Sequence, residues 1–192
     1  PSKVIDREVW LGPAGTLASL VVATRNRGNR LERCLRAVAA MDLDPRLWEL
    51  IVVDNGSTDE TADVVRASRA YMPTMIKYVF EPARGASAAR NAGAAVSSGG
   101  VIAFTDDDCY VASNYLTRVL EAFQADLKLG WVTGRVELYD PNDAPITINP
   151  SQTSRRFAPK VFLYTDDVIG ANLSLRREAI DAPDQPPRAV YP

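Results

Sequence analysis

The chain has 192 residues, of which 46% are hydrophobic and 24% charged, so it fits one globular domain and is not an intrinsically disordered protein. The formal net charge of -2 gives no overall basic character that would favour nucleic acid as the main partner. Histidine is absent, which excludes Ser-His-Asp and Cys-His catalysis and argues against a zinc site.

The cysteines and the N-terminus bear on the compartment. Cys34 and Cys109 belong to no CxxC pair, so we expect free thiols in a reducing compartment. The N-terminal PSKVIDREVW lacks the plan of a signal peptide, and no apolar run reaches the length of a membrane span. We therefore expect a cytoplasmic protein without a transmembrane segment, either free or associated with the inner face of the membrane. The chain starts without Met, which fits a piece of a longer protein.

Strands and helices alternate after a polar arm over residues 1–16. The apolar run LASLVVA predicts a buried strand over 17–23. Apolar residues at helical spacing predict an amphipathic helix from about Arg30. WELIVV predicts a second strand over 48–53, and the capping-box spacing of STDE at 57–60 predicts a helix beginning near Thr58.

The pattern then continues to the middle of the chain. Residues 75–80 alternate as a strand does, and ASAARNAGAAVSS predicts a helix over 86–98 whose small residues allow close packing on a sheet. A short apolar run predicts a strand over 101–104. Ser113 is the expected N-cap of a helix with an apolar face, formed by Leu116, Val119, Leu120 and Phe123.

The remainder of the chain is less regular. We expect a strand over 131–139, a loop over 140–156 that is either a functional flap or disordered, and a strand over 168–175. RREAI begins a helix, and the Pro-rich residues 181–192 are expected to be an extended tail. Four strand–helix alternations predict an α/β fold with a Rossmann-like, mostly parallel sheet flanked by helices.

Three consecutive carboxylates, Asp106, Asp107 and Asp108, follow the expected strand over 101–104. Ligands of open parallel sheets bind at the carboxyl ends of the strands, where these side chains would lie. Their mutual repulsion would be relieved by a divalent cation, which takes carboxylate oxygens as ligands. The alternative is a solvated acidic turn that caps the next helix. Arg25 and Arg27, just after the first strand, are placed to meet phosphate, whereas Arg30 and its neighbours are expected on a solvated helix face.

Four segments together resemble the family 2 glycosyltransferases of the A-type fold. They are SLVVATRNRGNRLERCL, LIVVDNGSTDET, PARGASAARNAGAAVSSGGVIAFTDDDC and GANLSLRREAI, in this order. The resemblance implies a catalytic domain over about residues 17–180, between the arm over 1–16 and the tail over 181–192. It further implies transfer of a sugar from a UDP-type or GDP-type donor to a saccharide or lipid-linked acceptor. Mg2+ or Mn2+ would bridge the donor's diphosphate and the Asp-x-Asp motif.

The resemblance also implies roles for single residues. Those matching the family's nucleotide-sugar site are Ala23, Thr24, Asn26, Asp54, Asn55, Arg84, Arg90, Asp106 and Asp107; those matching the metal ligands are Asp106 and Asp108; those matching the acceptor side are Gly170, Ala171 and Asn172. Asn55 departs from the Asp that this family often has, which weakens the inference to uridine. The alternatives are a helix-surface ion pair for Arg90 and a buried strand for residues 170–172.

The catalytic base stays unassigned. In an inverting transfer a carboxylate removes the proton of the acceptor hydroxyl. In the family this group lies beyond the segment matched by GANLSLRREAI, where this chain continues with DAPDQPPRAVYP, so the domain is expected to be truncated at its C-terminus. The nearby acids Asp166, Asp167 and Asp181 are expected at the surface. One alternative is therefore a nucleotide-sugar binding module without efficient catalysis. Another is a nucleotidyltransferase of related fold, which would want a Gly-rich loop with Lys or Arg straight after the first strand, where TRNRGN is a poor match.

Overall fold

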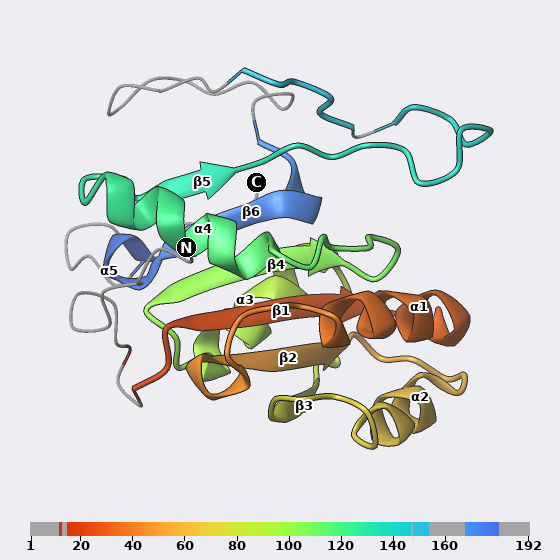
Figure 1. The fold of residues 1–192 in the computed structure, drawn as a ribbon. Coiled ribbons are helices and arrows are strands. Elements are labelled where there is room, and N and C mark those ends of the chain that lie inside the picture. Colours follow the sequence, from red (N-terminus) through yellow and green to blue (C-terminus); the bar gives the residue numbers. More distant parts are fainter. Residues whose placement is uncertain (1–11, 13–14, 147, 154–167, 181–192) are drawn as a thin grey trace.

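A six-stranded sheet with helices on both faces forms the centre of the computed structural model (Figure 1). The structure describes residue 12 and residues 15–146, 148–153 and 168–180. The strand order is β3-β2-β1-β4-β6-β5, which places β1 and β4 in the middle. The expected α/β fold is therefore confirmed.

Four strands run parallel to one another. They are β1 (Ala18–Thr24), β2 (Trp48–Asp54), β3 (Ile76–Phe80) and β4 (Val101–Asp106). In the register of these strands Thr24 lies opposite Asp54, and Ala23 lies opposite Asp106. The polar ends of β1, β2 and β4 consequently meet at one edge of the sheet, as the parallel arrangement requires.

Two short antiparallel strands complete the sheet beside β4. β6 (Leu173–Arg176) pairs with β4, and β5 (Trp131–Thr133) pairs with β6. The strand expected over 131–139 was too long, because pairing ends at Thr133 and Val136 then forms an isolated bridge with Asn149. The strand expected over 168–175 was also wrong at its start, where residues form the 3-10 helix η3 (Gly170–Asn172).

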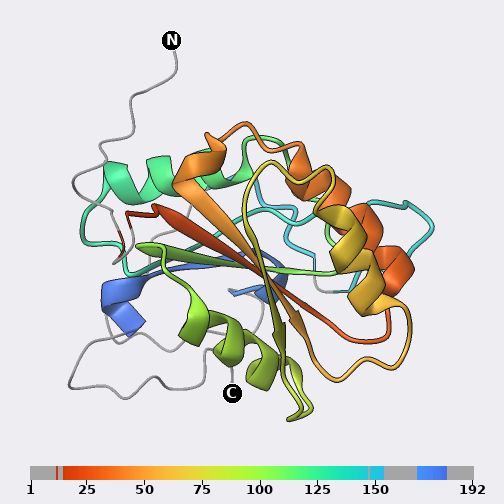
Figure 2. The same ribbon diagram turned by 90° about the horizontal axis from the view of Figure 1, so that it is seen from below.

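Helices cover both faces of the sheet (Figure 2). One face carries α1 (Gly28–Ala39), α2 (Thr61–Ser68) and α4 (Tyr115–Ala125), and the short η1 (Pro45–Leu47) precedes β2. The other face carries α3 (Ala86–Val96) and α5 (Arg177–Ile180). The larger core cluster lies beneath α1, α2 and α4, and the smaller one lies beneath α3. The chain therefore folds as three layers, with the sheet between two layers of helices.

The Ala-rich helix α3 lies unusually close to the sheet. A Cβ atom built on Gly93 would lie 2.4 Å from Cγ1 of Val21 and 3.1 Å from Cγ2 of Val53. Real atoms do not approach so closely, so the missing side chain sets the distance between α3 and the sheet. The expectation that small residues allow close packing is confirmed at this position.

Three helices start at other residues than expected, and at α2 the reason is that the capping hydroxyl has another partner. α2 begins at Thr61, and the Ser57 hydroxyl accepts the backbone N–H of Asn26 at 2.9 Å instead of capping the helix. Asp59 accepts the backbone N–H of Thr61 in its place. α1 begins two residues before Arg30, and α4 follows Asn114 without a side-chain cap, so Ser113 is not its N-cap.

Several expectations lie outside the described residues: most of the arm over 1–16, the end of the loop over 140–156, and the tail over 181–192. Within the described part, every helix is too short or too polar to cross a bilayer.

Candidate functional site

The acid tip consists of Asp106, Asp107 and Asp108, and every carboxylate in it contacts an arginine. Nη2 of Arg90 lies 2.5 Å from Asp106. Nη1 of Arg27 lies 3.0 Å from Asp107 and 3.1 Å from Asp108, and Nη1 of Arg30 lies 3.4 Å from Asp108. The expected repulsion among the carboxylates is therefore compensated within the protein itself.

Asp107 differs from its neighbours because it is buried, with 3% of its surface exposed. The Thr24 hydroxyl at the end of β1 donates a hydrogen bond of 2.7 Å to Asp107 Oδ2. Burial raises the pKa of the Asp107 carboxyl, and the hydrogen bonds from Thr24 and Arg27 hold back part of that rise. Asp107 thus ties β1, β4 and the start of α1 together and leaves its two neighbours at the surface.

Asp106 and Asp108 are placed to share a cation. One ligand atom from each, together with Sγ of Cys109, forms a group whose members lie within 4.8 Å of one another. Carboxylate oxygens are the ligands that Mg2+ and Mn2+ prefer. Burial raises the pKa of the Cys109 thiol to about 12, so without a bound cation the two carboxylates are the charged donors of this group. The donor set therefore fits a hard divalent cation held by two carboxylates.

Arg90 contacts the acid tip from the face of the sheet that α3 covers. It belongs to α3, and only 9% of its surface is exposed. Arg90 does form an ion pair, as its alternative expected, but the pair with Asp106 is largely buried on the arginine side and not at the helix surface. A contact of Arg90 with the nucleotide stays a prediction. Arg90 holds Asp106 in a fixed position.

Hydrogen bonds connect the loop after β1 to the loop after β2. Asn26 has a φ angle of 51°, a left-handed conformation that Asn tolerates. Its side-chain oxygen accepts the backbone N–H of Thr58 at 2.7 Å. Asp59 accepts the backbone N–H of Gly28, in the first turn of α1, at 3.2 Å. The Asn26 amide, matched to the nucleoside-binding loop, thus bonds to the second loop in this structure.

Asp54 and Asn55 are both buried at the end of β2 and bonded to protein groups. Asp54 accepts the Tyr78 hydroxyl at 2.6 Å and the backbone N–H of Ser57 at 2.7 Å. Asn55 donates to the carbonyls of Glu81 and Ala83 at 3.0 and 2.6 Å, and accepts the backbone N–H of Gly85 at 2.8 Å. An aspartate could not make the two donated bonds. Asn55 therefore shapes the loop that carries the exposed Arg84.

The acceptor-side candidates lie beside the acid tip. β6 runs antiparallel to β4 with Leu173 opposite Phe104, so the preceding residues of η3 lie along the end of β4. Asn172 donates from Nδ2 to the carbonyl of Arg135 at 3.1 Å, which fixes the chain after β5. Gly170 and Ala171 complete the same turn of 3-10 helix, so the alternative of a buried strand is wrong.

Three features of the site were not expected from the sequence. Arg30, assigned to a solvated helix face, is exposed but contacts Asp108. Tyr78 bonds to Asp54, a contact that follows from the parallel pairing of β2 and β3. Cys109 lies within the possible ligand group, and its position directly after the acidic triplet was the available signal. Asp166, Asp167 and Asp181, the acids nearest to the unassigned base, lie outside the described residues.

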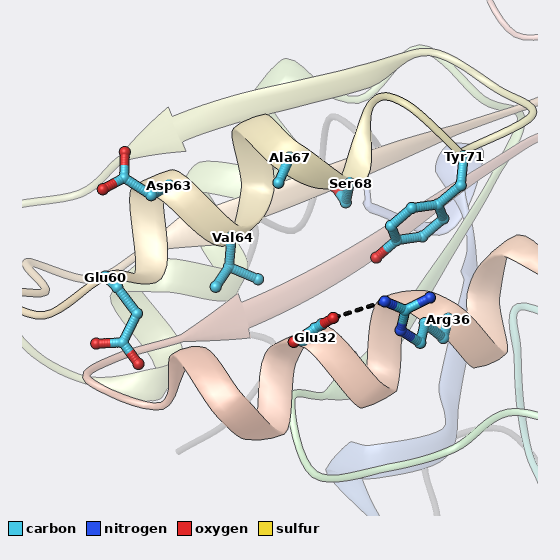
Figure 3. A pocket seen from close by; sticks show the side chains of 8 residues that line it. All are labelled: Glu32, Arg36, Glu60, Asp63, Val64, Ala67, Ser68 and Tyr71. Atoms are coloured by element: carbon cyan, nitrogen blue, oxygen red, sulfur yellow. Dashed lines mark hydrogen bonds and ion pairs between the residues drawn. The ribbon is translucent and has the colours of Figure 1, made fainter.

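An open cavity of about 470 Å3 lies between α1 and α2 and is a separate feature (Figure 3). Glu60, Asp63 and Glu32 line it, and Glu32 pairs with Arg36 there. None of the candidate site residues borders it. Its charged lining residues are three carboxylates and one arginine, whereas three arginines balance the three carboxylates of the acid tip, so the acid tip remains the candidate site for a diphosphate.

Comparisons with known proteins agree with this geometry. The model of the family described as "Glycosyl transferase family 2" matches residues 19–182. Validoxylamine A glucosyltransferase from Streptomyces hygroscopicus subsp. limoneus is 36% identical over 129 residues, which are 66% of this chain and 28% of that protein.

Two solved structures are similar in fold. The mannosyltransferase PcManGT from Pyrobaculum calidifontis, in complex with GDP-Man and Mn2+, has a TM-score of 0.57 and 26% identity over 69% of this chain and 38% of its own. TarS from S. aureus, in complex with UDP-GlcNAc, has a TM-score of 0.64 and 20% identity over 86% of this chain and 47% of its own. The chain thus spans less than half of each of these proteins.

Proposed function

Since the chain belongs to glycosyl transferase family 2, we propose that it holds the donor-binding part of an enzyme that transfers a sugar from a nucleoside diphosphate sugar to an acceptor hydroxyl. The observation that carries this proposal is the placement of Asp106 and Asp108. They lie at the carboxyl end of β4, with ligand atoms close enough to share one cation. This is where an open α/β sheet binds its ligands.

In this proposal Asp106 and Asp108 would hold Mg2+ or Mn2+. The bound ion would supply positive charge beside the leaving diphosphate. The support is the hard-oxygen donor set and the Mn2+ in the similar mannosyltransferase. Arg90 keeps Asp106 oriented, and Asp107 fixes the strand ends beneath the site.

The residues proposed to bind the nucleoside and the acceptor lie around the proposed cation site. We assign the nucleoside to the ends of β1 and β2, near Ala23, Thr24, Asn26, Asp54 and Asn55, with Arg84 on the adjacent loop. The donor is of the UDP or GDP type, which the donors of the two similar structures support. The acceptor, a saccharide or a lipid-linked molecule, would approach from the side of Gly170, Ala171 and Asn172, next to the end of β4.

An inverting transfer needs a carboxylate base to take the proton of the acceptor hydroxyl. We leave that group unassigned, because the acids nearest to its place in the sequence are not among the described residues. The domain over residues 17–180 between an arm and a tail, and the cytoplasmic location, stay predictions.

The test is an incubation with UDP-glucose, UDP-GlcNAc and GDP-mannose in the presence of Mn2+, in which water serves as the acceptor and released nucleoside diphosphate is measured. A parallel incubation with UTP or GTP and a sugar 1-phosphate measures released pyrophosphate. We expect release of nucleoside diphosphate from one donor and its loss in Asp106→Asn/Asp108→Asn. The exposed Asp63→Asn, which removes a carboxylate on α2, is the control and should not change it.

The other outcomes separate the alternatives. Pyrophosphate release from the nucleoside triphosphate would indicate a nucleotidyltransferase. Donor binding without release would indicate a binding module. Binding of none of the donors, with or without Mn2+, would contradict the proposal altogether.

A further inference from the structure

Arg27 bridges two of the three carboxylates of the acid tip. Its Nη1 lies 3.0 Å from Oδ1 of the buried Asp107 and 3.1 Å from Oδ2 of the exposed Asp108. Asp108 is also one of the two carboxylates placed to hold a cation. One guanidinium nitrogen therefore already provides positive charge at the carboxylate where a metal ion would provide it.

The three arginines at the acid tip differ in their freedom to move. The side chain of Arg90 is 11% exposed and stays on Asp106. The side chain of Arg27 is 49% exposed and stands at the N-cap of α1, on the loop between β1 and that helix. A divalent cation that binds Asp108 repels the guanidinium at 3.1 Å from the same carboxylate. The Arg27 side chain can then rotate away from Asp108 toward solvent, because half of it is already exposed.

We propose that Arg27 is a donor-binding residue that changes partner when the donor binds. Without a metal ion it neutralises Asp107 and Asp108. When a divalent cation takes Asp108, the guanidinium leaves that carboxylate and binds the diphosphate of the nucleotide sugar. This inference rests on the proposed function and adds to it the residue that couples the metal to the donor.

The balance of charge supports the coupling. Three carboxylates face three arginines at the acid tip, so a divalent cation alone adds uncompensated positive charge. The diphosphate of a nucleotide sugar brings negative charge that offsets it. A guanidinium is also well suited to phosphate oxygens, because it donates in a planar fork. The cation and the donor should therefore bind more tightly together than separately.

The first experiment measures Mn2+ alone, by electron paramagnetic resonance of the free ion, without nucleotide. Arg27→Gln removes the competing charge from Asp107 and Asp108, so we expect Mn2+ to bind about fivefold to tenfold more tightly than to the wild type. Arg36→Gln is the matched control. It removes one arginine charge from the same helix, where Arg36 pairs with Glu32, and should leave Mn2+ affinity unchanged.

The second experiment measures UDP and GDP by calorimetry at saturating Mn2+. Here Arg27→Gln should bind the nucleotide about tenfold more weakly, because a charge-assisted hydrogen bond to phosphate is lost. Opposite changes in the two affinities identify the exchange of partners. A merely structural role of Arg27 would weaken both.

Arg27→Lys covers the case in which Arg27→Gln does not fold, as judged by circular dichroism and thermal melting without metal. Lysine keeps the positive charge but lacks the planar guanidinium, so we expect tighter Mn2+ binding and weaker nucleotide binding, each by a smaller factor than in Arg27→Gln. Unchanged or weaker Mn2+ binding in the folded variant overturns the displacement from Asp108. Failure of the wild type to bind either nucleotide would instead refute the proposed function and the diphosphate contact, while the Mn2+ comparison would still decide the displacement.

Discussion

Asn55 illustrates how one residue can match a family motif and still serve this chain differently. Its amide hydrogens go to the carbonyls of Glu81 and Ala83, and its oxygen accepts the N–H of Gly85. The motif identified the position, but the partners come from the loop after β3, more than twenty residues away. A sequence pattern contains no information on such long-range contacts of a side chain.

Asn55→Asp should lower the free energy of unfolding by about 2–3 kcal/mol at neutral pH, because a carboxylate would face two carbonyl oxygens without a proton to donate. The loss should shrink near about pH 4, where a protonated carboxyl can donate one bond. Urea unfolding at both pH values measures it. Asn29→Asp, an exposed amide on α1, is the control and should change stability by less than about 1 kcal/mol. An equal loss at both pH values would contradict this role of Asn55.

The acidic triplet was the part of the site that the sequence predicted best. Three carboxylates after an apolar run indicated a strand end, which the structure shows at Asp106. They also indicated a cation site, which stays a prediction, and the structure places ligand atoms of Asp106 and Asp108 close enough to share one ion. The burial of Asp107 was not predictable, since it depends on Thr24 and Arg27, about eighty residues earlier.

At the scale of elements, the parallel strands could be predicted to within two residues, because β1, β2 and β4 are mainly apolar runs and β3 shows the alternation of a strand. The lengths of β5 and β6 could not. Both depend on antiparallel pairing beside β4, and local alternation of residues does not reveal where such pairing ends. The helix cap predicted at Ser57 was also wrong, because the Ser57 hydroxyl accepts the backbone N–H of Asn26 in the loop after β1.

A buried carboxylate at the opposite edge of the sheet links β2 to its neighbours. Glu49 accepts the hydroxyl of Ser19, both donors of Ser98, and the ammonium of Lys77 at 2.7 Å. Burial alone would raise the pKa of Glu49, but the donors from Lys77, Ser19 and Ser98 together hold it below its usual value. A lowered pKa in the folded state stabilises the fold above the unfolded pKa, and this contribution is lost as the pH falls through the folded pKa.

Glu49→Gln should therefore lower the free energy of unfolding by about 1–3 kcal/mol at pH 7, allowing for the partial exposure of Lys77. The difference from the wild type should diminish below about pH 4. Urea unfolding across this range measures it, with the exposed Glu32→Gln as the control. A difference that does not vary with pH would show that Glu49 acts through packing rather than charge.

The packing of α3 on the sheet gives a second prediction at this scale. Gly93→Ala places a Cβ atom 2.4 Å from the stiff side chain of Val21, so α3 must shift away from β1. We expect a loss of about 2–3 kcal/mol in the free energy of unfolding. Gly130→Ala is the matched control, because its Cβ would lie 3.5 Å from Ala179 in ordinary contact. Equal stability of the two variants, measured by urea unfolding, would contradict the close packing of α3.

At the scale of the whole molecule, the parallel sheet is what assembles the site. The ends of β1, β2 and β4 meet at one edge, and η3 returns to the same edge from the far end of the chain. The order of motifs in the sequence allowed this assembly to be predicted through the family resemblance. The net charge of the chain gave no indication of the site, because the arginines that neutralise the acid tip are balanced by acidic residues elsewhere in the chain.

The central claim is that the acid tip binds a divalent cation and, with it, a nucleoside diphosphate. Calorimetric titration of UDP and GDP, with and without Mn2+, into the wild type and into Asp106→Asn/Asp108→Asn tests it most directly. We predict that one nucleotide binds only in the presence of Mn2+ and that the double variant loses at least about tenfold in affinity. Nucleotide binding that ignores both the metal ion and the substitutions, or no binding at all, would contradict the account and make the acidic triplet a solvated turn.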